Sequence, residues 1–202
     1  MERELLVTGI GGQGVQLVAK VIAQAAMTEG REVQLFGSYG GMMRGGSTEA
    51  TVVVADEAIV APPTVEAAWS AILLHHEYSA SVLDRVRDGG VVLVNATVFE
   101  HPLDCSRCEV VEVPAGKMAV ELGHSTAASM VMAGAYAAVT GLVGLASLEV
   151  AAREALPSYR AQHAERNALA LRAGFSACPT RTAPAGVGAC TTPAGSSRWI
   201  AP

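Results

Sequence analysis

Charged side chains are scarce in this chain, and positive charge is scarcer than negative. Asp, Glu, Lys and Arg make up 16% of the 202 residues, and 14 Lys and Arg against 19 Asp and Glu give a formal net charge of -5. Proteins that bind nucleic acid neutralise its phosphates with clustered Lys and Arg, so the composition argues against a nucleic-acid partner. Hydrophobic residues make up 50%, and part of the surface is therefore expected to face other protein chains.

Cysteine is too sparse for a disulfide-stabilised scaffold, with 4 in the whole chain. We expect these residues to remain thiols unless they hold a metal. Cys105 and Cys108 form a C-x-x-C pair, which occurs in zinc and iron–sulfur sites and in redox pairs. His101 is close enough to add a ligand, but Cys178 and Cys190 are too widely spaced to supply a second pair. The incomplete ligand set favours the absence of a metal site.

Features of export and of membrane insertion are also missing. The chain runs from Met-Glu-Arg-Glu directly into an apolar segment, with no hydrophobic leader or small-residue cleavage site. Residues 122–148 contain no Asp, Glu, Lys or Arg, but they are built from Ala, Gly, Ser and Thr and lack the aromatic belt and basic flanks of a membrane span. We expect a cytoplasmic protein in which this segment is a small-residue helix packed closely against another helix or subunit.

Alternating strand and helix patterns predict an α/β fold. Short apolar or β-branched runs predict strands at residues 4–8, 32–36, 49–54, 58–60, 91–95 and 109–113. Helical spacing predicts helices at residues 15–26, 78–86, 115–122 and 148–173, and the segment 69–75 fits either structure. Gly30 is a plausible end for the first helix. This alternation is typical of a mainly parallel, Rossmann-like three-layer sheet with helices on both faces.

The first strand leads into a glycine-rich turn, VTGIGGQGVQ at residues 7–16. Its Gly-x-Gly-x-x-Gly spacing allows a tight turn and close approach to a phosphate at a helix N-terminus. Nicotinamide sites also need an acidic residue at the end of the second strand to hold the ribose hydroxyls. That strand is expected to end Gln34-Leu35-Phe36-Gly37, without Asp or Glu. The motif is therefore a weak indication of a nicotinamide site, and close packing explains the glycines equally well.

A second glycine-dense loop, residues 37–47, follows the second predicted strand. It places the aromatic ring of Tyr39 and the guanidinium of Arg44 among exposed backbone N–H groups, which suits an anionic ligand or a partner's carboxylate. Close packing between chains is an equally good explanation. The two loops give these candidate ligand or interface residues: Gly9, Gly11, Gly12, Gln13, Gly14, Ser38, Tyr39, Gly40, Arg44, Gly45 and Gly46.

Three motifs in order, GIGGQGV, then SYG, then RGGSTEATVVV, resemble the gamma subunit of 2-oxoacid:ferredoxin oxidoreductases, which act on pyruvate, 2-oxoisovalerate, 2-oxoglutarate or indolepyruvate. The later GGVVLVN strand fits as well, so the resemblance covers residues 4–173. It implies a complex that decarboxylates a 2-oxo acid on thiamine diphosphate, passes electrons through iron–sulfur clusters to ferredoxin or a similar acceptor, and transfers the acyl group to coenzyme A.

The resemblance also implies which subunit of the complex binds each cofactor. Thiamine diphosphate with its magnesium belongs to the beta subunit and the clusters mostly to delta or beta subunits, so alpha, beta and delta subunits are the expected partners. The gamma chain would support the assembly and contribute to the coenzyme A side. The substrate pocket would lie largely on other chains, so the particular 2-oxo acid is not fixed here.

The residues themselves supply no catalytic machinery. No activated serine, paired carboxylates or complete nucleophile–base set is recognisable, and His75-His76-Glu77 fits a polar strand end because adjacent residues of a regular element point to different sides. We expect a single domain at residues 1–173 and a flexible tail at residues 174–202, which is rich in Pro, Gly, Ser and Thr. Two alternatives stay open: a stand-alone nicotinamide or flavin oxidoreductase, and a non-catalytic assembly module.

Overall fold

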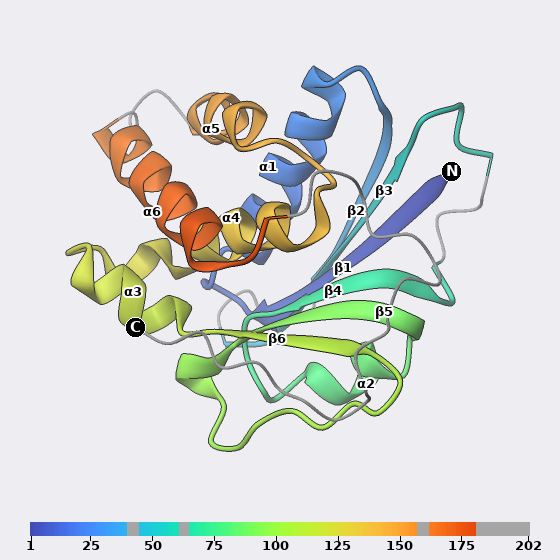
Figure 1. The fold of residues 1–202 in the computed structure, drawn as a ribbon, viewed down its shortest axis with the longest axis horizontal. Helices are drawn as coiled ribbons and strands as arrows, with labels where there is room; N and C mark the ends of the chain where they lie inside the picture. Colours follow the sequence, from blue (N-terminus) through green and yellow to red (C-terminus); the bar gives the residue numbers. More distant parts are fainter. Residues whose placement is uncertain (40–44, 61–64, 157–161, 181–202) are drawn as a thin grey trace.

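The protein forms one mixed sheet with helices packed on it (Figure 1). The computed structural model describes residues 1–39, 45–60, 65–156 and 162–180. The strands are β1 (Glu2–Ile10), β2 (Glu32–Tyr39), β3 (Ser47–Ala55), β4 (Ala68–Leu73), β5 (Val86–Asn95) and β6 (Glu109–Val113). The α-helices are α1 (Val15–Thr28), α2 (Ser79–Leu83), α3 (Ala115–Glu121), α4 (Ala128–Thr140), α5 (Leu145–Glu154) and α6 (Ala164–Ala177), and short 3-10 turns η1 (Ala96–Val98) and η2 (Ser125–Ala127) precede β6 and α4.

The strand order is β2-β3-β1-β4-β5-β6. Strand β3 runs antiparallel to both of its neighbours, β1 and β2, whereas the β1–β4, β4–β5 and β5–β6 pairs are parallel. The predicted mainly parallel α/β fold is therefore confirmed. The predicted β1-α1-β2 unit is present, but β3 is inserted between its two strands, so that Val52 faces Leu5 on one side and Leu35 on the other.

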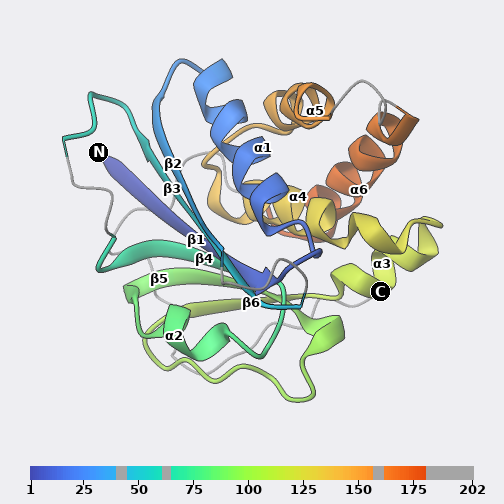
Figure 2. The ribbon, with the colours of Figure 1, turned by 180° about the vertical axis from the view of Figure 1, so that it is seen from behind.

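The two faces of the sheet are covered unequally (Figures 1 and 2). On one face, the large core cluster joins the sheet to α1 and α4, and α5 and α6 pack on these helices as an outer layer. On the other face, a smaller cluster centred on Leu6, Leu73 and Val92 is covered by α2 through Val82 and by connecting segments. The predicted three layers are present, and the second helical layer consists of α2.

Several predicted boundaries moved for identifiable reasons. The segment 69–75, which fitted either structure, contains strand β4 up to Leu73, and residues 58–60 form no strand. The helix expected to run to Val86 ends at Leu83, because Val86 already pairs with Ala68 as the first residue of β5. Gly30, with φ of 81°, follows the end of α1 as expected. Most of the expected tail, residues 181–202, lies outside the described residues, but the boundary at residue 173 falls inside α6.

The middle of the uncharged segment forms the buried helix α4, as its composition predicted, whereas residues 122–127 form a turn and η2 and residues 145–148 begin α5. Every residue of α4 from Ser129 to Thr140 is buried, and the helix packs against α6. Among the described residues, none of the helices has both the length and the apolar character needed to cross a membrane. The close approach depends on two glycines: a Cβ on Gly134 would overlap the Leu171 carbonyl, and one on Gly174 would overlap the Val131 carbonyl. Small residues therefore set the spacing between α4 and α6.

We predict that Gly134→Ala and Gly174→Ala each destabilise the protein by about 1–3 kcal/mol, because the added methyl group overlaps a backbone carbonyl of the facing helix. Elsewhere inside a helix, replacing glycine by alanine usually stabilises a protein, by about 1 kcal/mol. Urea denaturation of each variant measures the effect. Leu169→Ala on exposed α6 surface is the control and should change stability by less than about 0.5 kcal/mol. Glycine variants as stable as the control would contradict this packing.

The thinly covered face contains a buried carboxyl group. Glu112 on β6 lies opposite Val94 of the smaller cluster, is 4% exposed, and its Oε2 has no hydrogen-bond partner among the described residues. Burial raises the pKa of the Glu112 carboxyl, because desolvation penalises the charged form. At a pH above the folded-state pKa, ionisation of Glu112 costs more free energy in the folded chain than in the unfolded chain, so it lowers the stability of the fold.

Glu112→Gln should therefore raise the urea midpoint at pH 7, where the amide avoids a buried charge. The gain should disappear below about pH 4, where folded and unfolded chains both hold a neutral carboxyl group. The exposed Glu121→Gln is the matched control and should shift the midpoint little at either pH. If Glu112→Gln instead lowers the urea midpoint relative to wild type at pH 7 but not at pH 4, the carboxylate has a stabilising partner.

Candidate functional site

The first glycine motif forms a rigid turn between β1 and α1. Gly12 and Gly14 have left-handed backbone conformations, with φ of 105° and 85°, which favour glycine. Gly14 is the N-cap of α1. The Gln13 side chain folds back over the turn, and its Oε1 accepts a hydrogen bond of 2.9 Å from the Ile10 N–H. The interpretation of this motif as a strand-to-helix turn is confirmed.

Polar side chains occupy the space that the glycines of this region leave open. An added Cβ would lie within 3 Å of a side-chain oxygen at three positions: Gly9 against Gln13, Gly14 against Ser129, and Gly37 against Gln16. Ser129 belongs to α4 and is 4% exposed. Gln16 also donates from Nε2 to the Glu49 carbonyl of β3 at 2.9 Å. The turn is therefore fixed to α4 and to β3, contacts that its sequence alone does not indicate.

The two predicted glycine loops lie side by side at the carboxyl end of β1. The Gly11 N–H donates a 2.9 Å hydrogen bond to the Gly46 carbonyl, and Ile10 pairs with Ser47 at the start of β3. Gly45, with φ of 78°, is exposed. The sequence motifs thus form one continuous backbone surface. Loop residues 40–44, which include Gly40 and Arg44, lie outside the described residues.

The remaining candidates of the second loop belong to β2. Ser38 is exposed, and Tyr39 ends the strand opposite Thr48 of β3. The predicted loop thus begins later than expected, because β2 continues through Gly37 to Tyr39. Pairing with β3 accounts for the extension, since each of these residues has a partner on that strand.

The electrostatic character of this surface favours negative charge. Helix α1 begins at the surface with no side-chain cap and no acidic residue in its first turn, and α4 begins likewise with no side-chain cap. Uncapped helix N-termini carry partial positive charge and free N–H groups. Because Ser129 near the start of α4 faces Gly14 at the start of α1, the two helix N-termini are adjacent. Helix α4 continues directly from η2 and its Ala127 and Ser129 are buried, so the start of α1 is the part that suits a phosphate or carboxylate group.

The neighbouring strand ends at this edge are occupied by polar groups with partners of their own. His75 and His76 follow β4, and their rings stack with centroids 4.4 Å apart, so the expectation that they point to different sides is wrong. That expectation applies to regular strands and helices, whereas these residues lie in the irregular connection after β4. Burial and the neighbouring His76 lower the pKa of His75. Thr97 accepts hydrogen bonds from the Gly116 and Lys117 N–H groups and caps α3.

The geometry gives no support to a nicotinamide site. Strand β2 ends Gly37-Ser38-Tyr39, without the carboxylate that would hold the ribose hydroxyls. The nearest carboxylate on the neighbouring strand belongs to Glu49, opposite Ser38. It already forms an ion pair of 2.6 Å with Arg85. The missing acid noted in the sequence is therefore not replaced from β3.

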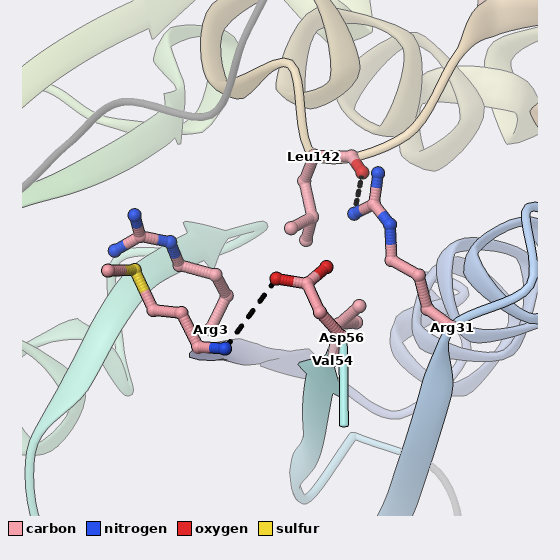
Figure 3. A pocket seen from close by; sticks show the side chains of 6 residues that line it. Arg3, Arg31, Val54, Asp56 and Leu142 are labelled. Atoms are coloured by element: carbon pink, nitrogen blue, oxygen red, sulfur yellow. Dashed lines mark hydrogen bonds and ion pairs between the residues drawn. The ribbon is translucent and has the colours of Figure 1, made fainter. Parts of the chain in front are cut away.

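A hollow of about 390 Å³ lies at the opposite end of β1, and Figure 3 shows the residues that line it. Its polar groups are already engaged. Asp56 pairs with the Met1 amino group at 3.5 Å, Arg31 donates to the Leu142 carbonyl, and the Arg3 guanidinium lies 4.7 Å from the centre of the Trp69 ring. The hollow is therefore separate from the glycine loops.

The two cysteines of the C-x-x-C motif form a disulfide bond. Cys105 and Cys108 are joined by a disulfide bond, which corrects the expectation of free thiols. Across residues 1–39, 45–60, 65–156 and 162–180, no three His, Cys, Asp or Glu side chains gather as metal ligands. Cys178 is a buried thiol whose pKa is raised by burial to about 11.

We predict that Gly14→Ala destabilises the protein more than Gly12→Ala. Both changes impose a left-handed backbone on alanine, at roughly 1–2 kcal/mol, but the new Cβ meets open space at Gly12 and the Ser129 hydroxyl at Gly14. Adding Ser129→Ala should recover about 1 kcal/mol in the Gly14→Ala background and nothing in the Gly12→Ala background. Chemical denaturation of the full double-mutant cycle tests this. Equal effects of Ser129→Ala in both backgrounds would show that Ser129 does not buttress the turn.

Comparisons with known proteins agree with the geometry. A family model described as pyruvate ferredoxin/flavodoxin oxidoreductase matches residues 4–177. The 2-oxoglutarate synthase subunit KorC of Methanothermobacter marburgensis is 31% identical over 181 residues, which cover 86% of this chain and 95% of that subunit.

Solved structures share the fold. The gamma subunit of a keto/oxoacid ferredoxin oxidoreductase from Geobacter sulfurreducens is similar with a TM-score of 0.71 and 25% identity, over 86% of this chain and 96% of that one. The 2-oxoglutarate:ferredoxin oxidoreductase of Magnetococcus marinus, with 2-oxoglutarate, coenzyme A and succinyl-CoA bound, has a TM-score of 0.74. At 17% identity over 33% of that longer chain, it shows the fold alone. The chain described here belongs to the pyruvate ferredoxin/flavodoxin oxidoreductase family, of which it is a gamma-type member.

Proposed function

We propose that this chain is the gamma subunit of a cytoplasmic, multi-subunit 2-oxoacid:ferredoxin oxidoreductase that converts a 2-oxo acid to an acyl-coenzyme A. The observation that carries the proposal is a match over nearly the whole chain to subunits of such enzymes, with coverage of 95–96% of the relatives' length.

The chain's role in that complex is supportive. The candidate surface contains backbone amides, glycines and a helix N-terminus without a side-chain cap, and it offers no nucleophile with an adjacent general base among the described residues. The expected division of labour places thiamine diphosphate with magnesium on the beta subunit and the iron–sulfur clusters mostly on delta or beta subunits, and ferredoxin or a similar protein accepts the electrons. Each of these groups needs ligands that the glycine loops do not provide.

The glycine loops are the part of the chain that we assign to the coenzyme A side of the complex. Coenzyme A carries phosphate groups, and the joined loops place the N-terminus of α1 and the exposed Gly12 and Gly45 at one edge of the sheet. Arg44, in the same loop as Gly45 and Gly46, would add a guanidinium that pairs with phosphate oxygens. The loops would bind the phosphates and leave the chemistry to the neighbouring subunits.

Gentle purification of the tagged chain from its native cells tests the assembly. We expect partner subunits to co-purify with thiamine diphosphate and iron, which metal analysis and cofactor extraction would quantify. A solitary chain that binds NAD(H) tightly would contradict the proposal and favour a stand-alone oxidoreductase. A chain that co-purifies with partners lacking thiamine diphosphate and clusters would favour an assembly module of another enzyme.

Arg44→Gln tests the coenzyme A assignment in the intact complex. We predict about a tenfold increase in KM for coenzyme A with kcat nearly unchanged, since one charged hydrogen bond is worth about 1.5 kcal/mol. The matched control is Arg172→Gln, which removes a guanidinium that pairs with Glu149 on the outer helices. If both variants leave the KM for coenzyme A unchanged, the second loop does not contact this substrate.

A further inference from the structure

The connection from β5 to β6 crosses the thinly covered face of the sheet without an α-helix (Figures 1 and 2). We call residues 99–108, between η1 and β6, the strap. Phe99, Leu103 and Cys108 of the strap pack against the smaller core cluster, beside α2. Since α2 is only 5 residues long, the strap supplies a large part of this cover.

The first end of the strap is held near the carboxyl end of β4. His76 Nδ1 lies 3.0 Å from the Val98 carbonyl, at hydrogen-bond distance, and its ring meets the Phe99 ring edge to face. These contacts do not involve the cysteines. This end should therefore stay in place whether Cys105 and Cys108 are oxidised to a disulfide or reduced to thiols.

The second end of the strap is held through Arg107, which lies between the two cysteines in sequence. The Arg107 carbonyl accepts a 2.8 Å hydrogen bond from the Gly89 N–H, and Nη2 donates to the Leu83 carbonyl at 2.6 Å. The guanidinium also lies 3.9 Å from Asp88. Arg107 thus joins the strap to the end of α2 and to the start of β5. Its orientation depends on the turn formed by residues 105–108.

The disulfide bond closes that turn. Cys105 and Cys108 have Cα atoms 5.5 Å apart, within the range that a disulfide bridges without backbone movement, and both are half-buried. Cys108 packs against the smaller cluster, whereas Ser106 and Arg107 between the cysteines are exposed. An external thiol can therefore approach the pair from solvent. The third protein ligand that a metal would require is absent from the described residues.

We propose that Cys105 and Cys108 form a reversible thiol–disulfide exchange site whose oxidised form fixes the second end of the strap. A thiolate of an external dithiol attacks the sulfur of Cys105, forms a mixed disulfide and releases the Cys108 thiolate, which takes up a proton. The second thiol of the reductant then attacks the mixed disulfide and releases Cys105 as a thiol. Two electrons and two protons pass to the protein, and the external dithiol becomes a disulfide. An external disulfide reverses the reaction.

Differential alkylation and mass spectrometry test the exchange on the folded, full-length protein. After equilibration in glutathione buffers of increasing oxidised fraction, peptides containing Cys105 and Cys108 should change together from two alkylated thiols to a disulfide, and dithiothreitol should reverse the change. Cys178, buried and with a raised pKa, is an internal control that should react in neither state. A pair that never forms the disulfide, or that excess dithiothreitol never reduces without denaturant, would overturn the proposal.

Hydrogen exchange tests the structural consequence. Reduction should speed exchange in the strap and in α2 by roughly tenfold, because the disulfide closes a loop whose ends are 3 residues apart in sequence and restricts local opening. Exchange in α4 and α6 should not change. Cys105→Ser should behave like reduced wild type in both buffers, whereas Ser106→Ala should keep the full response. Equal exchange in reduced and oxidised wild type would show that the sulfur bond does not hold the strap.

Discussion

The structure depends on the absence of a β-carbon at a few glycines around the carboxyl end of β1. At Gly9, Gly14 and Gly37, the missing side chain is replaced by an oxygen atom from Gln13, Ser129 or Gln16. These contacts fix the turn, the start of α4 and the β2–β3 pair against one another. The Gly11–Gly46 hydrogen bond is possible because of that arrangement. Among the described residues, this surface is therefore fixed by backbone and small polar contacts.

Local sequence patterns predicted most of the elements, but not how they pair. The strand at residues 109–113 and the start of the first helix at Val15 agree with the structure because hydrophobic spacing is a local property. The insertion of β3 between β1 and β2 was not predicted, because strand pairing depends on contacts between distant residues. Gly174 resembled the start of a tail, yet it lies inside α6, where close packing against α4 requires glycine. Glycine alone does not distinguish a turn from a close contact.

The candidate site was predicted in outline from the spacing of the two motifs. The sequence indicated both glycine loops, and the structure joins them through Gly11 and Gly46. It did not indicate Ser129, more than a hundred residues away, because a serine in a small-residue helix has no distinguishing local pattern. The missing acid after β2 argued against a nicotinamide site, and in the structure the Glu49 carboxylate of the neighbouring strand is paired with Arg85. The sequence also did not predict that the two faces of the sheet are covered unequally, because this depends on where α2 and the connection to β6 lie.

The central claim is that the joined glycine loops are the surface through which this chain works within a larger oxidoreductase. A cryo-electron microscopy structure of the complex purified through this chain, with coenzyme A added, tests it most directly. The account predicts that Gly11–Gly14 and Gly45–Gly46 lie against coenzyme A or against a neighbouring subunit. A structure in which these residues face open solvent while other surfaces make every contact would contradict it.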